Sequence, residues 1–415
     1  MPSQFFAWTI SALVFSGLII RPFKWPEYVW ALTGAVLLVL LGAVSPISAL
    51  SAVAEGNDVY LFLIGMMLLS EAARIHGLFD YLDKQAVRHA AGSSTRLFVI
   101  IYAVGTMVTV FLSNDATAVV LTPAVYAAAK SAKVNPLPYL FICAFIANAA
   151  SFVLPISNPA NLLIYGAHMP TLGEWLARFL LPSILAIGVT FAVLFWTQKK
   201  ALDAPQILDI TPSLPTEGKI VAVGIAMTAA GLLVASALGV QLGLPTFALG
   251  SLVSLVILVT SRSSPWPLLK GVSWGVLPLV AGLFVVIEGL AHVGLLESID
   301  ASLRQLVDAS STMAPFLAGA VVAVTSNVIN NLPMGLIVSS AAHAGDMPNR
   351  VIDAMVIGVD LGPNLSVTGS LATILWLVAL RREGITVSSR QFLALGLLVM
   401  PLALIAALTA VALQP

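Results

Sequence analysis

The chain of 415 residues is 59% hydrophobic and 9% charged, and its nineteen basic and nineteen acidic side chains give a formal net charge of zero. Soluble domains carry about 25% charged residues, so the composition excludes an ordinary soluble domain, and the balanced charge gives no reason to expect a nucleic-acid partner. The single cysteine, Cys143, excludes an intrachain disulfide and a metal site built from several thiolates.

Long uncharged stretches predict an all-α polytopic membrane protein. Residues 134–173 and 220–261 contain no Asp, Glu, Lys or Arg, and each stretch is long enough for two passes at about 20 residues apiece. Simple membrane spans are predicted at 6–20, 28–45, 59–75, 174–196, 219–239, 245–261, 274–292 and 391–412.

Four longer segments carry polar residues near their centres. Segments 97–129 and 312–343 are too long for one pass and predict re-entrant helical hairpins with polar tips. Segments 137–165 and 351–380 predict broken helices, because Pro159 and Pro363 cannot donate backbone hydrogen bonds. The polar, Pro-rich stretch 197–218 predicts a cytoplasmic linker between a first half, 1–196, and a second half, 219–415.

The two halves share residues in the same order, which indicates a duplication. Gly65, Glu71 and Gly77 recur 217 residues later as Gly282, Glu288 and Gly294; Ser113-Asn114 recurs 213 residues later as Ser326-Asn327; and Pro159 with Asn161 resembles Pro363 with Asn364. Several matches at nearly one offset predict an internal repeat. In this alignment Asn114 has a counterpart in Asn327, whereas Val328 stands where a second Asp115 would be.

The basic residues predict the orientation of the chain. Sixteen of the nineteen Lys and Arg residues, all except Arg178, Arg304 and Arg350, fall on one side when the loop 74–96 is cytoplasmic. Each half then contains five transmembrane helices plus one re-entrant hairpin, and the odd number of passes makes the repeat inverted. We therefore expect a multi-pass protein of the inner membrane with both termini on the outer face and with the two hairpin tips meeting near the midplane.

Inverted repeats with broken helices are typical of secondary transporters that bind their substrate at the repeat interface. Polar residues gather at both predicted tips and both breaks: Ser113, Asn114, Asp115, Thr117, Asn158, Asn161, Asn327, Asn330, Asn331, Asp360, Asn364 and Thr368. Such residues could instead join helices through hydrogen bonds, but their clustering at two tips and two breaks favours a binding site. No metal ligand set and no phosphate-binding loop is evident, so no cofactor is expected.

The carboxylates are the most informative of these residues. A carboxylate at the bilayer centre costs about 2.5–3.5 kcal/mol on insertion scales and is functional by default. Asp115 is therefore predicted to carry the proton that drives transport, whereas Asp360 either shares that role or caps backbone groups freed by the break. Glu71 lies one turn from Arg74, which predicts an ion pair on the helix face at the membrane interface. Glu288 has no such neighbour and is a further candidate for proton coupling.

Three segments resemble one known family: "FLSNDATAVVLTPAV" (111–125), "SNVINNLPMGLI" (326–337) and above all "VIGVDLGPNLSVTGSLATILWL" (356–377). They are similar to the arsenite efflux permeases of the ArsB type, within a superfamily that also contains NhaD-type sodium/proton antiporters and dicarboxylate carriers. The resemblance runs from the third predicted span to the last. It implies export of arsenite and antimonite as neutral hydroxides, driven by entering protons, by an elevator motion, and in some cases with an ATPase of the ArsA type.

The substrate chemistry agrees with the polar set. Arsenous and antimonous acids offer hydroxyls that both donate and accept, which suits amides, hydroxyls and a carboxylate. We therefore expect Ser113, Asn114, Thr117, Asn158, Asn161, Asn327, Asn330, Asn331, Asn364 and Thr368 to hold the substrate, and Asp115, Asp360 and Glu288 to serve proton coupling.

Three other functions fit some of these features. A sodium/proton or sodium-coupled carboxylate transporter of the same superfamily would use the tips to coordinate sodium, and sodium dependence of uptake separates it from an arsenite carrier. An intramembrane aspartyl hydrolase could pair Asp115 with Asp360, but it would have no use for duplicated hairpins. A passive channel would conduct without responding to a proton gradient.

Overall fold

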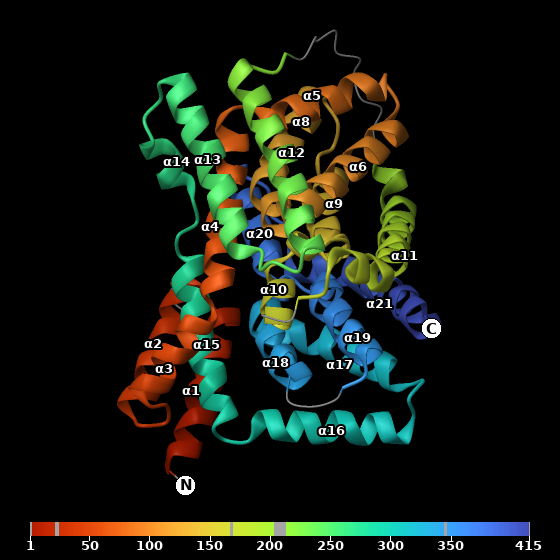
Figure 1. Ribbon diagram of the computed structural model, residues 1–415. Helices are drawn as coiled ribbons and strands as arrows, with labels where there is room; N and C mark the ends of the chain where they lie inside the picture. Colours follow the sequence, from red (N-terminus) through yellow and green to blue (C-terminus); the bar gives the residue numbers. More distant parts are fainter. Residues whose placement is uncertain (1, 21–24, 167–168, 203–212, 344–346, 415) are drawn as a thin grey trace.

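The computed structural model describes residues 2–20, 25–166, 169–202, 213–343 and 347–414, and within these ranges the chain forms helices and no strand (Figure 1). Five helices are long and apolar enough to cross a membrane, and a sixth span results if the bent pair α3–α4, which turns by 47°, is counted as one. The protein is therefore an all-helical, multi-pass membrane protein. Most of the predicted linker, 203–212, lies outside the described residues.

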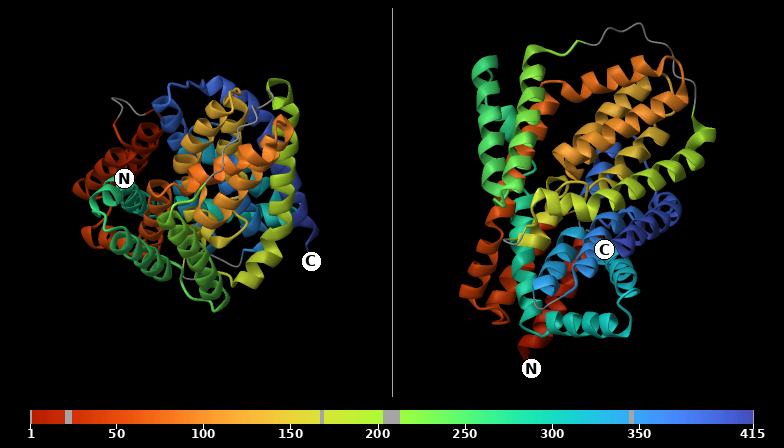
Figure 2. Two further views of the ribbon diagram at one scale, coloured as in Figure 1. Left: turned by 90° about the horizontal axis from the view of Figure 1, so that it is seen from above. Right: turned by 45° about the vertical axis from the view of Figure 1, so that its right-hand side comes forward.

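One group of helices, here the first bundle, combines the start of each half of the chain (Figure 2). It contains α1 (Pro2–Ile20), α2 (Glu27–Leu40), α3 (Pro46–Glu55), α4 (Asn57–Ile75), α12 (Thr216–Ala237), α13 (Gly243–Ser261), α14 (Trp266–Gly271) and α15 (Val276–Ala291). The predicted span 28–45 ends five residues early, because the chain turns at Gly42, which has a φ of 70°. Ser45 then caps α3 by accepting a hydrogen bond from the backbone N–H of Ser48.

Repeated glycines let the helices of the first bundle cross closely. A Cβ on Gly65 would lie 2.3 Å from the backbone oxygen of Thr246 on α13, and a Cβ on Gly282 would lie 2.7 Å from the backbone carbon of Ala31 on α2. Membrane helices pack through small residues in this way. Gly65 and Gly282 thus serve the same purpose: each allows a close helix crossing, of α4 with α13 and of α15 with α2.

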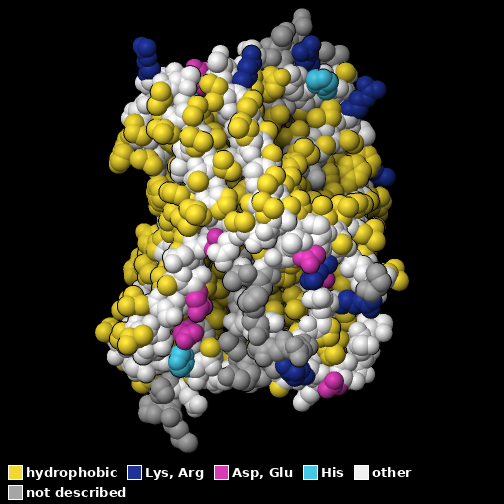
Figure 3. All heavy atoms as spheres, viewed as in Figure 1, with side chains coloured by type: hydrophobic (Ala, Val, Ile, Leu, Met, Phe, Trp, Pro, Cys, Tyr) yellow, Lys and Arg dark blue, Asp and Glu magenta, His cyan; other side chains and the backbone are white. Residues whose placement is uncertain are grey.

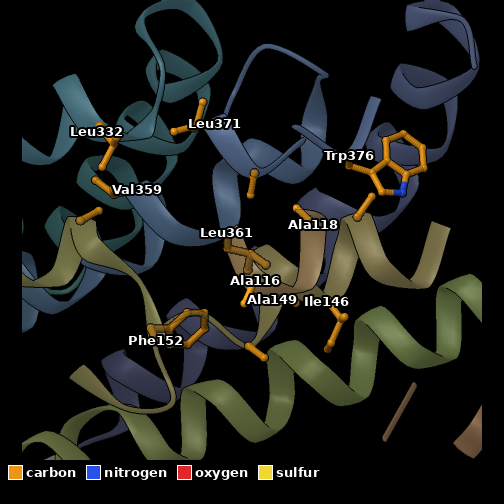
Figure 4. Packing of buried hydrophobic residues seen from close by; sticks show 14 of the residues in the cluster. Ala116, Ala118, Ile146, Ala149, Phe152, Leu332, Val359, Leu361, Leu371 and Trp376 are labelled. Atoms are coloured by element: carbon orange, nitrogen blue, oxygen red, sulfur yellow. The ribbon is translucent and has the colours of Figure 1, made fainter. Parts of the chain in front are cut away.

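The other group, here the second bundle, holds both hairpins and both broken helices. It contains α6 (Ser94–Leu112), α7 (Asn114–Ala116), α8 (Thr122–Ser131), α9 (Leu137–Ala149), α10 (Pro159–Tyr165), α11 (Leu172–Gln198), α17 (Ala314–Ile329), α18 (Asn331–His343), α19 (Asn349–Leu361), α20 (Leu371–Arg382) and α21 (Ser389–Leu413). Its core is filled by buried aliphatic and aromatic side chains, and Figure 4 shows Ala116, Ala149 and Leu361 near the centre of this packing.

Two amphipathic helices that the sequence did not predict lie at opposite ends of the molecule. They are α5 (Leu78–Ala90) and α16 (Leu295–Ala309), and each follows a glycine with positive φ, Gly77 at 72° and Gly294 at 82°. In Figure 1, α5 crosses the upper end and α16 the lower end. On the face drawn in Figure 3, hydrophobic side chains cover the middle, and Lys and Arg gather mainly at the end that carries α5.

The structure moves the register of the two hairpins by about one helical turn relative to the sequence alignment. The chain reverses at Ser113, with a φ of 106°, and at Asn330, with a φ of 78°. These reversals lie 217 residues apart, the same spacing as the glycines. Ser113-Asn114 thus corresponds to Asn330-Asn331, and the predicted match with Ser326-Asn327 is wrong because those residues still belong to the helix α17.

The two broken helices differ in where the proline lies. Pro159 is the first residue of α10, after an irregular stretch that separates it from α9. Pro363 lies in a short 3-10 turn, Gly362–Leu365, that directly follows α19. The two prolines are therefore not equivalent, and the residue that matches Asn364 is Asn148, 216 positions earlier at the end of α9.

Candidate functional site

The tip of the first hairpin borders a small cavity of about 60 Å³. Ser113 and Asp115 line it from the hairpin, while Met66 and Glu71 line it from α4. Asn114 is buried beside it, and its side-chain oxygen accepts a hydrogen bond of 2.8 Å from the backbone N–H of Asp115. Asp115 thus lies at the contact between the two bundles.

The tip of the second hairpin borders a separate, smaller cavity of about 20 Å³. Five lining residues of the first cavity have counterparts here at the offset of 217: Phe62 and Leu279, Met66 and Leu283, Ser113 and Asn330, Asp115 and Leu332, Ala116 and Pro333. The lining residues of the two cavities therefore match at the offset of the predicted repeat. The residue at the position equivalent to Asp115 is therefore Leu332. It is not Val328, which lies on α17 and is 57% exposed. Only the first tip carries a carboxylate at this position.

A fully buried polar group joins the two broken helices. The amide Nδ2 of Asn158 donates to Oδ1 of Asp360 at 2.6 Å, and Nδ2 of Asn161 donates to the backbone oxygen of Ser151 at 2.9 Å. Among the described residues, Asp360 Oδ2 and Asn161 Oδ1 are buried and have no hydrogen-bond partner. Buried acceptors of this kind call for a bound proton, water or ligand.

The pair of equivalent asparagines meets at the centre of the second bundle. Asn148 donates through Nδ2 to Oδ1 of Asn364 at 3.0 Å, and Asn364 donates in turn to the backbone oxygen of Phe145 at 3.0 Å. Both side chains are fully buried. Sequence reasoning missed Asn148, although a lone asparagine in the apolar run "CAFIANAA" was a usable signal.

The remaining predicted residues of the second hairpin connect the hairpin to the break after α19. Asn327 donates to the backbone oxygen of Gly362 at 3.0 Å and accepts from the hydroxyl of Ser366 at 2.7 Å. Thr368 donates to the backbone oxygen of Asn327, and Asn330 donates to that of Thr368. Asn331, the counterpart of Asn114, is buried. Most of these polar groups thus hold the tip in place.

Two predicted residues lie away from the tip cavities. Thr117 is buried inside the first hairpin, where its hydroxyl lies 2.8 Å from that of Thr109 on α6. Glu288 lies in another cavity, of about 490 Å³, which it shares with Glu55 and Asp58, and its carboxylate is 3.5 Å from His292. The structure therefore does not bring Glu288 together with Asp115 or Asp360. The expected ion pair of Glu71 with Arg74 is confirmed, with Arg74 Nε 2.8 Å from Glu71 Oε2.

Comparison with known proteins agrees with the transporter architecture. The family model described as "Citrate transporter" matches residues 15–363. The arsenical pump membrane protein of Yersinia enterocolitica is 28% identical over 373 residues, covering 85% of each chain, and that of Escherichia coli K12 is 28% identical over 410 residues, covering 93% of each. The resemblance to arsenite permeases is confirmed. The YdaH transporter of Alcanivorax borkumensis shares the fold, with a TM-score of 0.58 at 15% identity over 88% of this chain and 86% of that one.

Proposed function

Because this chain belongs to the citrate transporter family, we propose that it exports arsenite, and antimonite, as the neutral hydroxides in exchange for entering protons. The observation that carries this proposal is the position of Asp115. It lines the cavity between the first hairpin and α4, and the residue at the equivalent position of the second tip is the apolar Leu332. A carboxyl at a moving contact can bind a proton on one side and release it on the other.

The substrate follows from the chemistry of the polar groups together with the relatives. The tip cavities offer hydroxyl, amide and carboxylate oxygens, and the lining residues include no Lys or Arg. A neutral trihydroxide needs only hydrogen-bond partners, whereas a citrate ion with several negative charges would need compensating positive charge. Arsenite export also agrees with the arsenical pumps that are 28% identical to this chain.

The motion belongs to the same proposal. The first bundle would act as a fixed scaffold, and the second bundle, with its hairpins and broken helices, would slide against it in the inner membrane. The equivalence of the two tip cavities supports this, since an inverted pair of hairpins gives two related gates that can open in turn. In this proposal both termini face outward, and proton entry drives export, with an ArsA-type ATPase as a further partner in the cell.

Exchange of Asp115 for asparagine tests the proposal. Everted membrane vesicles of the wild type should accumulate arsenite when their lumen is acidified, in medium without sodium or ATP for a partner ATPase. The Asp115→Asn variant should lose at least nine-tenths of this gradient-driven uptake, because the amide cannot carry the proton. Leu332→Asn, at the equivalent position of the second tip, is the matched control and should retain it. Unchanged coupling in Asp115→Asn contradicts the assignment, and a requirement for sodium favours a sodium-coupled carrier.

A further inference from the structure

A row of polar side chains runs between α10 and α19 and ends near the rim of the second bundle. On α19, Asp353 and Asp360 are seven residues apart, so two helical turns place them on the same face. Across from them lie Asn158, Asn161 and Tyr165, which follow one another at helical spacing from the N-cap of α10 to its last residue. These five residues form what we call the polar seam.

Contacts tie both carboxylates to the opposite side of the polar seam. Asp360 accepts from Asn158 at 2.6 Å, and Asp353 Oδ1 accepts from the hydroxyl of Tyr165 at 3.2 Å. Both aspartates are buried, with exposed fractions of 0% and 2%. The groups that face Asp353 with charge or a titratable proton are Tyr165 from α10 and Arg178 from α11.

Arg178 connects the polar seam to water. Its side chain is 25% exposed, and its Nη1 lies 3.5 Å from Asp353 Oδ1 and 3.4 Å from Asn349 Oδ1. The contact with Asp353 is single and long, unlike the two-point pair of Arg74 with Glu71, in which Nε and Nη2 each reach a different carboxylate oxygen. Two-point pairs are the geometry suited to a permanent anchor, so the looser pair at Asp353 is easier to break.

The inner end of the polar seam has unused acceptors. Asp360 Oδ2 and Asn161 Oδ1 are buried and have no partner among the described residues. A protonated carboxyl can donate a hydrogen bond, so a proton on Asp360 Oδ2 would supply the donor that two neighbouring acceptors lack. The polar seam thus places a loosely paired carboxylate near the rim two helical turns away from a carboxylate at the centre that can use a proton.

We propose that Asp353 is a proton carrier that supplies Asp360 from the side of the molecule where α16 lies. The proposal rests on the proton antiport proposed above. A hydronium ion gives its proton to the Asp353 carboxylate and leaves as water; the neutral acid separates from Arg178, which keeps its charge. The proton then passes inward to the Asp360 carboxylate, and Asp353 returns to the anion paired with Arg178. Tyr165 stays neutral and orients Asp353.

The test compares two readouts in everted vesicles: arsenite accumulation driven by an acidic lumen, and exchange of labelled for unlabelled arsenite at equal pH on both sides. The ratio of driven accumulation to exchange isolates proton supply from folding and substrate binding. Asp353→Asn should lower this ratio at least tenfold, and Asp353→Glu, which keeps a titratable group, should restore it. Glu383→Gln is the control, since this exposed side chain lies outside the polar seam, and its ratio should equal that of the wild type.

A second variant keeps the inference testable if Asp353→Asn folds poorly. Arg178→Gln removes the positive charge that favours the Asp353 anion, so the pH at which driven accumulation is half-maximal should move upward by about one unit. An unchanged ratio in Asp353→Asn, or an unchanged pH profile in Arg178→Gln, overturns the inference while leaving arsenite export intact. Absence of arsenite flux in the wild type overturns the proposed function and this inference with it.

Discussion

The hydrogen bond between Asn158 and Asp360 allows the most quantitative prediction. Replacing Asn158 by alanine removes the donor of a 2.6 Å bond to a buried carboxyl, and also the side-chain oxygen that accepts from the backbone N–H of Ala160 at the start of α10. When Asp360 is ionised, a hydrogen bond to its carboxylate contributes about 1.5–3 kcal/mol, and loss of a helix N-cap costs about 1 kcal/mol. At a pH where Asp360 is ionised, Asn158→Ala should therefore lower the free energy of unfolding by about 2.5–4 kcal/mol.

Two further variants separate these contributions. Asn158→Ser keeps a capping oxygen and should lose only the contribution of the bond to Asp360, about 1.5–3 kcal/mol. In an Asp360→Asn background, Asn158→Ala should cost about 1–2 kcal/mol less than in the wild type, because the charge on the acceptor is already gone. The free energy of unfolding is measured by denaturant titration of the purified protein in detergent. A loss below about 0.5 kcal/mol for Asn158→Ala, or the same loss in both backgrounds, would show that this bond does not join the broken helices.

Two other predictions concern the framework of the protein. Gly65→Val should lower the melting temperature strongly, because a Cβ there would lie 2.3 Å from the backbone of α13. Gly188→Ala on α11, where nothing lies within 4 Å of the added Cβ, should leave the melting temperature unchanged or raise it. Equal melting temperatures of the two variants would refute the close crossing of α4 and α13. Asp83 on the surface helix α5 is buried, and its carboxylate oxygens have no partner among the described residues. Burial raises the pKa of Asp83 well above its usual value, so ionisation of this carboxyl destabilises the folded state. The free energy of unfolding is therefore highest below the unfolded pKa of about 3.9, and it falls as the pH rises toward the folded pKa. Asp83→Asn should thus melt at a higher temperature than the wild type at pH 8 and show a smaller gain at pH 5; a gain independent of pH contradicts the ionisation argument.

Much of the architecture could be predicted from hydropathy and charge alone. The simple spans appear as helices close to their predicted positions, because an uncharged run of about 20 residues has few alternatives in a membrane. The pair of Glu71 with Arg74 was also predictable, since residues three apart on a helix are neighbours. The amphipathic helices α5 and α16 were not predicted, because they contain too many polar residues to resemble membrane spans.

Tertiary contacts explain what the sequence could not predict at the site. The reversals at Ser113 and Asn330 depend on positive φ angles that neither residue type specifies, so the alignment of the hairpins was displaced by about a turn. Thr117 faces Thr109 inside its own hairpin and not the cavity. Asn148 meets Asn364 across the bundle, a contact between residues 216 positions apart that no local pattern encodes.

Coupled proton movement tests the central claim most directly. Purified protein is reconstituted into liposomes that enclose a pH-sensitive dye, with choline in place of sodium, and an arsenite gradient is applied at equal starting pH. Proton antiport predicts that arsenite entering the liposomes drives protons out, so the lumen becomes alkaline in the wild type and in Leu332→Asn but not in Asp115→Asn. Arsenite entry without any change of internal pH in the wild type would contradict proton antiport.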